Sequence, residues 1–133
     1  MPKASIIFAL HAHMPFIRHP EHLYSTQECW YYEAVWESYV PLLSALECLS
    51  DKNIPFGITV SFSPTLIEMA ADEFLTSRLM DHLDRLLKLT KVEADRLSDR
   101  LSGNKGFAQL PIMYAERIET AISALESKGG PLG

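Results

Sequence analysis

The chain has 133 residues, of which 47% are hydrophobic, and its formal net charge is −5. This length suits one compact domain and is too short for two. The basic residues are scattered, which argues against a nucleic-acid partner, and no apolar run reaches the roughly 18 residues that a membrane-spanning helix needs.

The first predicted element is a strand over residues 4–10, where a short apolar run contains two isoleucines. Such a run is typical of a strand that is buried on both faces of a parallel sheet. One lysine precedes the run, and histidine and proline follow it in place of a small-residue cleavage site, so we expect a strand and not a signal peptide. A second run, Phe56–Phe62, has the same character and predicts a second strand.

A helix is predicted between the two strands, because apolar residues recur there with the period of one helical face. These residues are Val35, Tyr39, Leu42, Leu46 and Leu49. Pro41 interrupts the pattern and should kink or restart the helix. Strand, helix and strand in this order predict a parallel βαβ unit over residues 1–63.

The two cysteines, Cys29 and Cys48, bracket this helix. A continuous helix would separate them by roughly 28 Å, whereas a disulfide requires Cα atoms within about 7 Å. We therefore expect free thiols and a reducing, cytoplasmic location.

Further helices are predicted over residues 64–128. Ser63 and Pro64 suit the cap and the first position of a helix, and the chain has helical character almost throughout from Leu66 to Leu101. The sequence "SGNKG" at Ser102–Gly106 predicts a turn, and "SKGGPLG" should end the last helix. The apolar faces of these helices are formed by Leu79, Leu83, Leu86, Leu97 and Leu101, and then by Leu110, Tyr114, Ile118, Ala121 and Leu125.

Two strands followed by helices make an incomplete fold, because two parallel strands are rarely stable without further neighbours. We therefore predict an α/β chain that forms one incomplete domain. It consists of the βαβ start over residues 1–63, a helical segment over residues 64–128 and a tail over residues 129–133.

The segment "HAHMPF" (residues 11–16) places His11 and His13 where the first strand ends. Side chains at positions i and i+2 of an extended chain point to the same side, and ligands bind at the carboxyl ends of parallel strands. The pair could bind a substrate, bind a metal, or simply pack and be solvated. Zinc binding would also draw on His19 and His22, but no complete ligand set of defined geometry is evident.

An aromatic cluster with nearby carboxylates follows at "ECWYYEAVW" (residues 28–36). Trp36 and Tyr39 are expected in the core. Trp30 is expected to precede the regular helix and to reach the strand-end surface, where its ring could contact a sugar, with Glu28 and Glu33 as acceptors for sugar hydroxyls.

Motifs for other chemistry are missing from the sequence. It has no Gly-rich phosphate loop and no G-x-S-x-G motif. Three further acidic residues are expected on solvated helix surfaces: Glu68, Asp72 and Glu73. We therefore identify no catalytic carboxylate pair in this chain.

Three segments in order resemble the N-terminal part of glycoside hydrolase family 57, in particular its 1,4-α-glucan branching enzymes and then its α-amylases. The segments are "FALHAHMPFIRHPE", "ECWYYEAVWESYVPLLSALECL" and "IPFGITVSFSPTLIEM". The resemblance covers residues 4 to about 70, and the later helices agree only in character.

The resemblance implies the N-terminal portion of a (β/α)7 barrel that acts on an α-glucan. It assigns His11 and His13 to the donor-sugar subsite and Trp30 to the glucan groove. Family members are retaining enzymes that use a glutamate and an aspartate on later strands, and they need no metal or other cofactor for the chemistry. The isolated chain is therefore expected to be inactive, with no catalytic residue of its own.

The expected partners are an α-glucan and the remainder of the barrel, with no nucleic acid and no membrane. One alternative is a small non-catalytic protein that binds carbohydrate or metal with this segment. Another is a helix-rich interaction module in which residues 64–128 bind a partner.

Overall fold

The computed structural model describes residues 7–100 and 105–131, and the chain divides into two compact units, Met1–Ala71 and Asp72–Gly133. The sequence placed a boundary between residues 63 and 64, whereas the first compact unit also includes the helix that follows. The elements of the first unit are β1 (Ala9–Ala12), α1 (Thr26–Ala34), a π-helical turn (Val35–Tyr39), α2 (Val40–Asp51), β2 (Thr59–Phe62) and α3 (Pro64–Ala71). Those of the second unit are α4 (Glu73–Arg100) and α5 (Lys105–Lys128).

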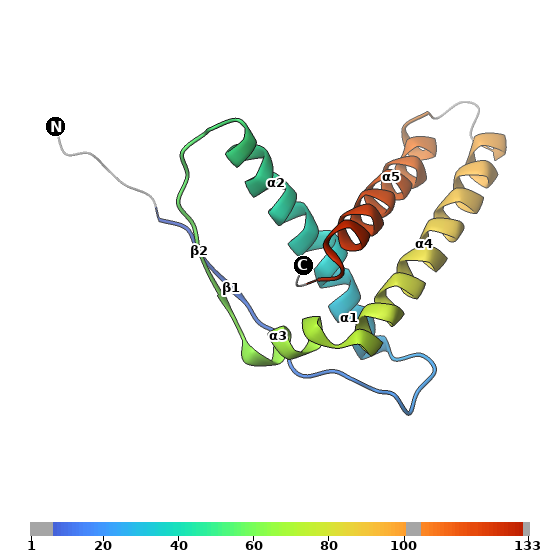
Figure 1. Cartoon of the computed structure of the whole chain (residues 1–133). Coiled ribbons are helices and arrows are strands. Elements are labelled where there is room, and N and C mark those ends of the chain that lie inside the picture. The colour runs from blue at the N-terminus through green and yellow to red at the C-terminus, as the bar shows by residue number, and fades with distance from the viewer. Residues whose placement is uncertain (1–6, 101–104, 132–133) are drawn as a thin grey trace. The chain divides into compact units, whose positions relative to one another are not determined.

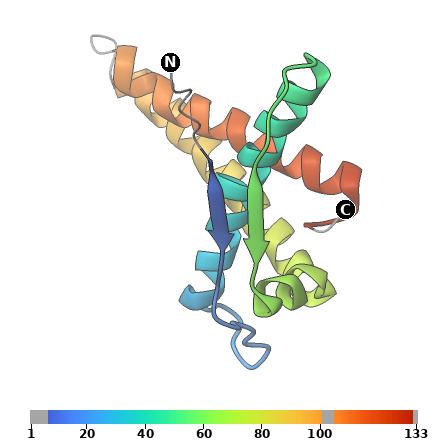
Figure 2. The ribbon, with the colours of Figure 1, turned by 90° about the vertical axis from the view of Figure 1, so that its left-hand side faces the viewer.

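The two strands form a parallel pair, which confirms the predicted βαβ unit (Figure 2). Ala9 lies opposite Thr59 and His11 opposite Ser61. Both strands are shorter than predicted: β1 begins at Ala9 and extends to Ala12, and β2 begins only at Thr59. Residues 4–6 of the first predicted strand lie outside the described residues.

The prediction that both strands are buried on both faces is wrong for the described residues. Leu10 is 39% exposed and Phe62 is 54% exposed, whereas Ala12 is buried. The physical reason is that a parallel sheet becomes buried only when helices cover both faces. Within this unit α1 and α2 lie on one side of the sheet (Figures 1 and 2), and among residues 7–71 each strand pairs only with the other.

The helix between the strands is interrupted where Pro41 predicts a restart. A π-helical turn, Val35–Tyr39, separates α1 from α2, and Pro41 lies in the first turn of α2. Proline has no N–H to donate and its ring clashes with the carbonyl of the preceding turn, and a wider π turn relieves such a conflict. The predicted apolar face is the less exposed one, because Val35 is buried and Leu42 is half-buried.

Ser63 caps α3 as predicted. Its Oγ accepts the N–H of Leu66 at 3.3 Å, and Pro64 is the first residue of the helix. As predicted, the chain is helical almost throughout from Leu66 to Arg100, with one break where α3 ends at Ala71. Asp72 then caps α4, since its Oδ1 accepts the N–H of Leu75 at 2.9 Å.

Replacing Asp72 by alanine is expected to lower the free energy of unfolding by about 1 kcal/mol, the typical loss for a helix cap. Asp72→Asn should keep most of the stability, because asparagine caps equally well. Urea unfolding of both variants checks this, with the exposed Asp81→Ala on the same helix as the control. Equal losses in Asp72→Ala and Asp72→Asn would contradict the capping role.

The second unit is a helical hairpin in which α4 and α5 run side by side (Figure 1). Its buried core consists of leucines of α4 and small or branched residues of α5: Leu75, Leu79, Leu83, Ile118, Ala121 and Leu125. An ion pair between Lys91 Nζ and Glu119 Oε1, at 2.7 Å, joins the two helices.

The predicted apolar face of the last helix is correct only in its second half. Leu110 and Tyr114 are exposed, and Pro111 is buried instead. The buried side continues from Ile118 back to Pro111, seven residues earlier and therefore on the same face. Leu110 is one position off that face and points away from the hairpin core.

The predicted turn at Ser102–Gly106 lies largely outside the described residues, as does Leu101. Lys105 and Gly106 already belong to α5, so the turn prediction is wrong for these two residues.

The end of α5 agrees with the prediction. The helix ends at Lys128, and Gly129 and Gly130 follow with φ of 75° and 125°. Only glycine adopts such angles readily, and the N–H of Gly130 donates to the carbonyl of Leu125 at 2.9 Å. No helix in the described part of the chain is long and apolar enough to cross a membrane.

Candidate functional site

The two histidines of the "HAHMPF" segment lie together at the end of β1. Their rings stack with centroids 5.7 Å apart and an angle of 15° between the ring planes. Both side chains are exposed. The i, i+2 spacing in an extended segment produces this arrangement, because alternate side chains share a face. The structure therefore presents two imidazoles to solvent as one surface feature.

Ser61 of β2 holds the first histidine. The parallel register places Ser61 opposite His11, and Ser61 Oγ lies 2.7 Å from His11 Nδ1. The same hydroxyl donates to the carbonyl of Leu10 at 3.4 Å. The orientation of the His11 ring is thus coupled to the pairing of the two strands.

The main chain around His13 is held by the junction between β2 and α3. The N–H of Ser63 donates to the carbonyl of Ala12 at 2.9 Å. Thr65 Oγ1 donates to the carbonyl of Met14 at 2.6 Å. Because the residues on both sides of His13 are hydrogen-bonded, the backbone that carries its ring is well defined.

The interpretation of the sequence missed Ser61 and Thr65. A signal was present, since hydroxyl residues occupy positions 61, 63 and 65, with the same alternation as the two histidines. Recognising it requires the register of the two strands, which the sequence did not provide.

The loop after His13 has two further attachments. The N–H of Ile17, which is buried, donates to Met69 Sδ at 3.2 Å. The N–H of His19 donates to Glu28 Oε1 at 2.7 Å. The loop that follows the histidine pair is therefore hydrogen-bonded to both α3 and α1.

Glu28 was predicted as a candidate acceptor for sugar hydroxyls, and the structure places it in the interior instead. It is only 1% exposed, and its second oxygen accepts the hydroxyl of Tyr32 at 3.0 Å. A buried carboxylate needs such donors because its desolvation is costly. Glu28 therefore has a structural role in holding the loop.

His19 and His22 form a separate group at the tip of this loop. His19 Nδ1 lies 2.9 Å from Glu21 Oε1, and His22 Nε2 lies 3.9 Å from the same atom. A hydrogen bond from its own backbone, and then the one from His19, hold the pKa of Glu21 below its usual value. In residues 7–100 and 105–131, no group of three or more His, Cys, Asp or Glu side chains could hold a metal ion.

Trp30 does not precede the regular helix, as the sequence indicated, but lies within α1. Its side chain is 56% exposed, and the structure records no ring contact between it and either histidine. Trp36 is buried and Tyr39 half-buried, which agrees with their predicted place in the core. Cys29 is buried, Cys48 is exposed, and both thiols are free.

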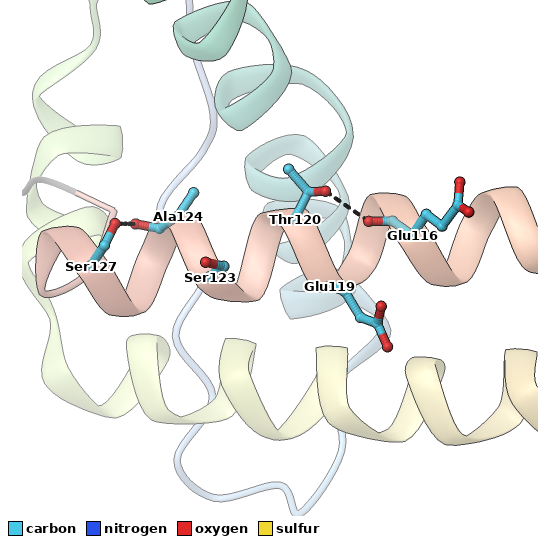
Figure 3. Close-up of a pocket in the computed structure, with 6 residues that line it drawn as sticks. All are labelled: Glu116, Glu119, Thr120, Ser123, Ala124 and Ser127. Carbon is cyan, nitrogen blue, oxygen red and sulfur yellow. Dashed lines mark hydrogen bonds between the residues drawn. The ribbon is translucent and has the colours of Figure 1, made fainter.

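A shallow hollow on α5 does not contain any of the predicted site residues. Figure 3 shows its lining by a single helix: Glu116, Glu119, Thr120, Ser123, Ala124 and Ser127. The hydroxyls of Thr120 and Ser127 donate to carbonyls of the same helix, at 2.8 and 2.9 Å. These polar groups are already engaged, and we assign the hollow no role.

Comparison with known proteins relates the chain to enzymes that act on glucans. No protein-family model matches the sequence. A 1,4-alpha-glucan branching enzyme of Thermococcus kodakarensis is 35% identical to it over 86 residues, which are 65% of this chain and 13% of that enzyme. The sequence similarity therefore concerns one short part of a much longer relative.

Two solved structures have the same arrangement of elements. The α-amylase AmyC from Thermotoga maritima matches with a TM-score of 0.83 at 28% identity, over 95% of this chain and 23% of that one. A GH57-type branching enzyme from the hyperthermophilic archaeon Pyrococcus horikoshii matches with a TM-score of 0.81 at 28% identity, over 92% of this chain and 22% of that one. The chain spans less than a quarter of the length of these relatives.

Proposed function

We propose that this chain is the N-terminal part of an α-glucan-acting enzyme of glycoside hydrolase family 57, most closely a 1,4-α-glucan branching enzyme. The observation that carries the proposal is the stacked pair of His11 and His13 at the end of β1. The similarity to a branching enzyme in sequence, and to an α-amylase and a branching enzyme in structure, supports it.

In this proposal His11 and His13 contact the donor sugar, and Trp30 contacts the glucan further along. Imidazole nitrogens can exchange hydrogen bonds with sugar hydroxyls, and the exposed indole of Trp30 offers an apolar face to a sugar ring. We assign no catalytic residue, metal or cofactor to this chain.

The reaction that we propose is a retaining double displacement, in which a glutamate forms a glycosyl-enzyme and an aspartate protonates the leaving oxygen. Such carboxylates stand about 5–5.5 Å apart. They would be supplied by later strands of a (β/α)7 barrel. In a branching enzyme a hydroxyl of another glucan then takes the place of water.

The remainder of that barrel is the second partner in the proposal. In the described part of the chain, each strand of the two-stranded sheet has one unpaired edge, and Leu10 of β1 and Phe62 of β2 are exposed. Unpaired strand edges attract further strands, and a closed barrel has none.

A reducing, cytoplasmic location is also proposed, supported by the free thiols of Cys29 and Cys48.

Titration of the 133-residue chain with maltoheptaose tests the sugar contacts. We expect the imidazole NMR signals of His11 and His13 to shift, and the double variant His11→Ala/His13→Ala to bind at least about tenfold more weakly, which corresponds to the loss of one or two hydrogen bonds. His22→Ala, at an exposed histidine of the neighbouring loop, is the matched control. Unchanged binding by the double variant would contradict the proposed site.

Assays of branching and of hydrolysis of amylose test the position of the catalytic residues. The isolated chain should bind glucan without turning it over. Robust turnover would refute the proposal that the catalytic carboxylates lie on later strands. A tight, stoichiometric zinc complex without glucan binding would instead favour the metal-binding alternative.

A further inference from the structure

Ser61 makes two hydrogen-bond contacts through one hydroxyl group. Its Oγ lies 2.7 Å from His11 Nδ1 and donates to the carbonyl of Leu10 at 3.4 Å. A serine hydroxyl has one proton to donate and two lone pairs that accept. A carbonyl oxygen can only accept, so Ser61 is the donor in the contact with Leu10, whereas either atom can be the donor in the contact with His11, depending on the tautomer of the ring.

When the proton of Ser61 points to the carbonyl of Leu10, the contact with His11 uses a proton of the ring. Neutral imidazole carries its proton on one of two nitrogens, and the hydrogen bond made by one nitrogen determines the state of the other. We propose that Ser61 is a positioning residue that holds neutral His11 as the Nδ1–H tautomer and leaves the lone pair of Nε2 available to a ligand. The choice of ligand rests on the proposed function: Nε2 of His11 accepts a hydrogen bond from a hydroxyl group of the glucan.

The backbone supports this role for Ser61. The register of the parallel pair places Ser61 and His11 opposite each other. Two residues after Ser61, the N–H of Ser63 donates to the carbonyl of Ala12, the residue that follows His11, at 2.9 Å. The pairing of the strands therefore brings the hydroxyl and the ring within hydrogen-bond reach of each other.

The tautomer has a consequence for ligand choice. A neutral His11 with a lone pair on Nε2 accepts a hydrogen bond but has none to donate outward. Hydroxyl compounds, which donate, suit this atom, whereas sulfate, which carries no proton at this pH and only accepts, does not. We expect maltoheptaose to bind and sulfate to leave the His11 signals unchanged at mildly alkaline pH.

Long-range proton–nitrogen NMR of the ligand-free, nitrogen-15-labelled chain measures the tautomer directly. At mildly alkaline pH, His11 should be predominantly Nδ1–H, and Ser61→Ala should convert it to a mixture of tautomers. Ser61→Thr should restore the wild-type signals, because threonine keeps the hydroxyl and suits a strand. Ser44→Ala, at an exposed serine of α2, should change nothing.

Two results would overturn the role of Ser61: an Nε2–H tautomer in the wild-type chain, or an unchanged tautomer in Ser61→Ala. Glucan affinity provides the second measurement. Ser61→Ala should bind maltoheptaose severalfold more weakly, Ser61→Thr should recover, and the effect should vanish in a His11→Ala background. If the wild-type chain binds no maltoheptaose, the proposed function fails, and the NMR measurement still decides the role of Ser61.

Discussion

Replacing Leu79 by alanine is expected to lower the free energy of unfolding by about 2–5 kcal/mol. Leu79 lies on α4 between Leu75 and Leu83, one turn away on either side, and all three are 0% exposed. Truncation removes buried methyl groups and leaves a cavity that the two helices of the hairpin can close only in part.

Urea unfolding followed by circular dichroism measures the effect. The matched control is Leu89→Ala on the same helix, since Leu89 is 64% exposed and its truncation should change stability by no more than about 0.5 kcal/mol. Similar losses for the two variants would mean that Leu79 is not in the hairpin core.

Replacing Glu28 by alanine is expected to cost about 3 kcal/mol, the upper end for hydrogen bonds to a charged group. The change leaves the N–H of His19 and the hydroxyl of Tyr32 without the acceptor that each has at 2.7 and 3.0 Å. It also releases the loop that follows the histidine pair. We therefore expect faster hydrogen exchange at the amide of His19 in addition to lower stability.

Glu28→Gln should lose less than Glu28→Ala, because the amide oxygen can still accept one of the two hydrogen bonds. The control is Glu33→Ala, at an exposed glutamate on the same helix, for which neither quantity should change appreciably. If exchange at His19 stayed slow in Glu28→Ala, the loop would be held mainly by its contacts with α3.

Some features of the fold could be predicted because neighbouring residues determine them. Ser63 and Pro64 mark the start of α3, Pro41 marks the restart of the preceding helix, and Gly129 follows the end of α5. Each effect comes from a local property: a side-chain acceptor, a missing N–H or an accessible positive φ.

Other predictions were wrong because burial depends on residues that are far away in the sequence. The apolar run around Leu10 predicts a buried strand, but only covering layers can bury it, and Leu10 is exposed. Leu110 is one residue off the face that α4 covers. Glutamate usually lies on the protein surface, but Glu28 is buried because the loop carrying His19 folds back over it.

In the candidate site, too, some features follow from neighbouring residues and others from residues that are far away in the sequence. The alternation of His11 and His13 in an extended segment was enough to predict that their rings share a face, and the observed stacking agrees. The partner of His11 could not be predicted in this way, because Ser61 lies fifty residues further along the chain. Local spacing decides the direction of a side chain, whereas the pairing of distant strands decides what the side chain meets.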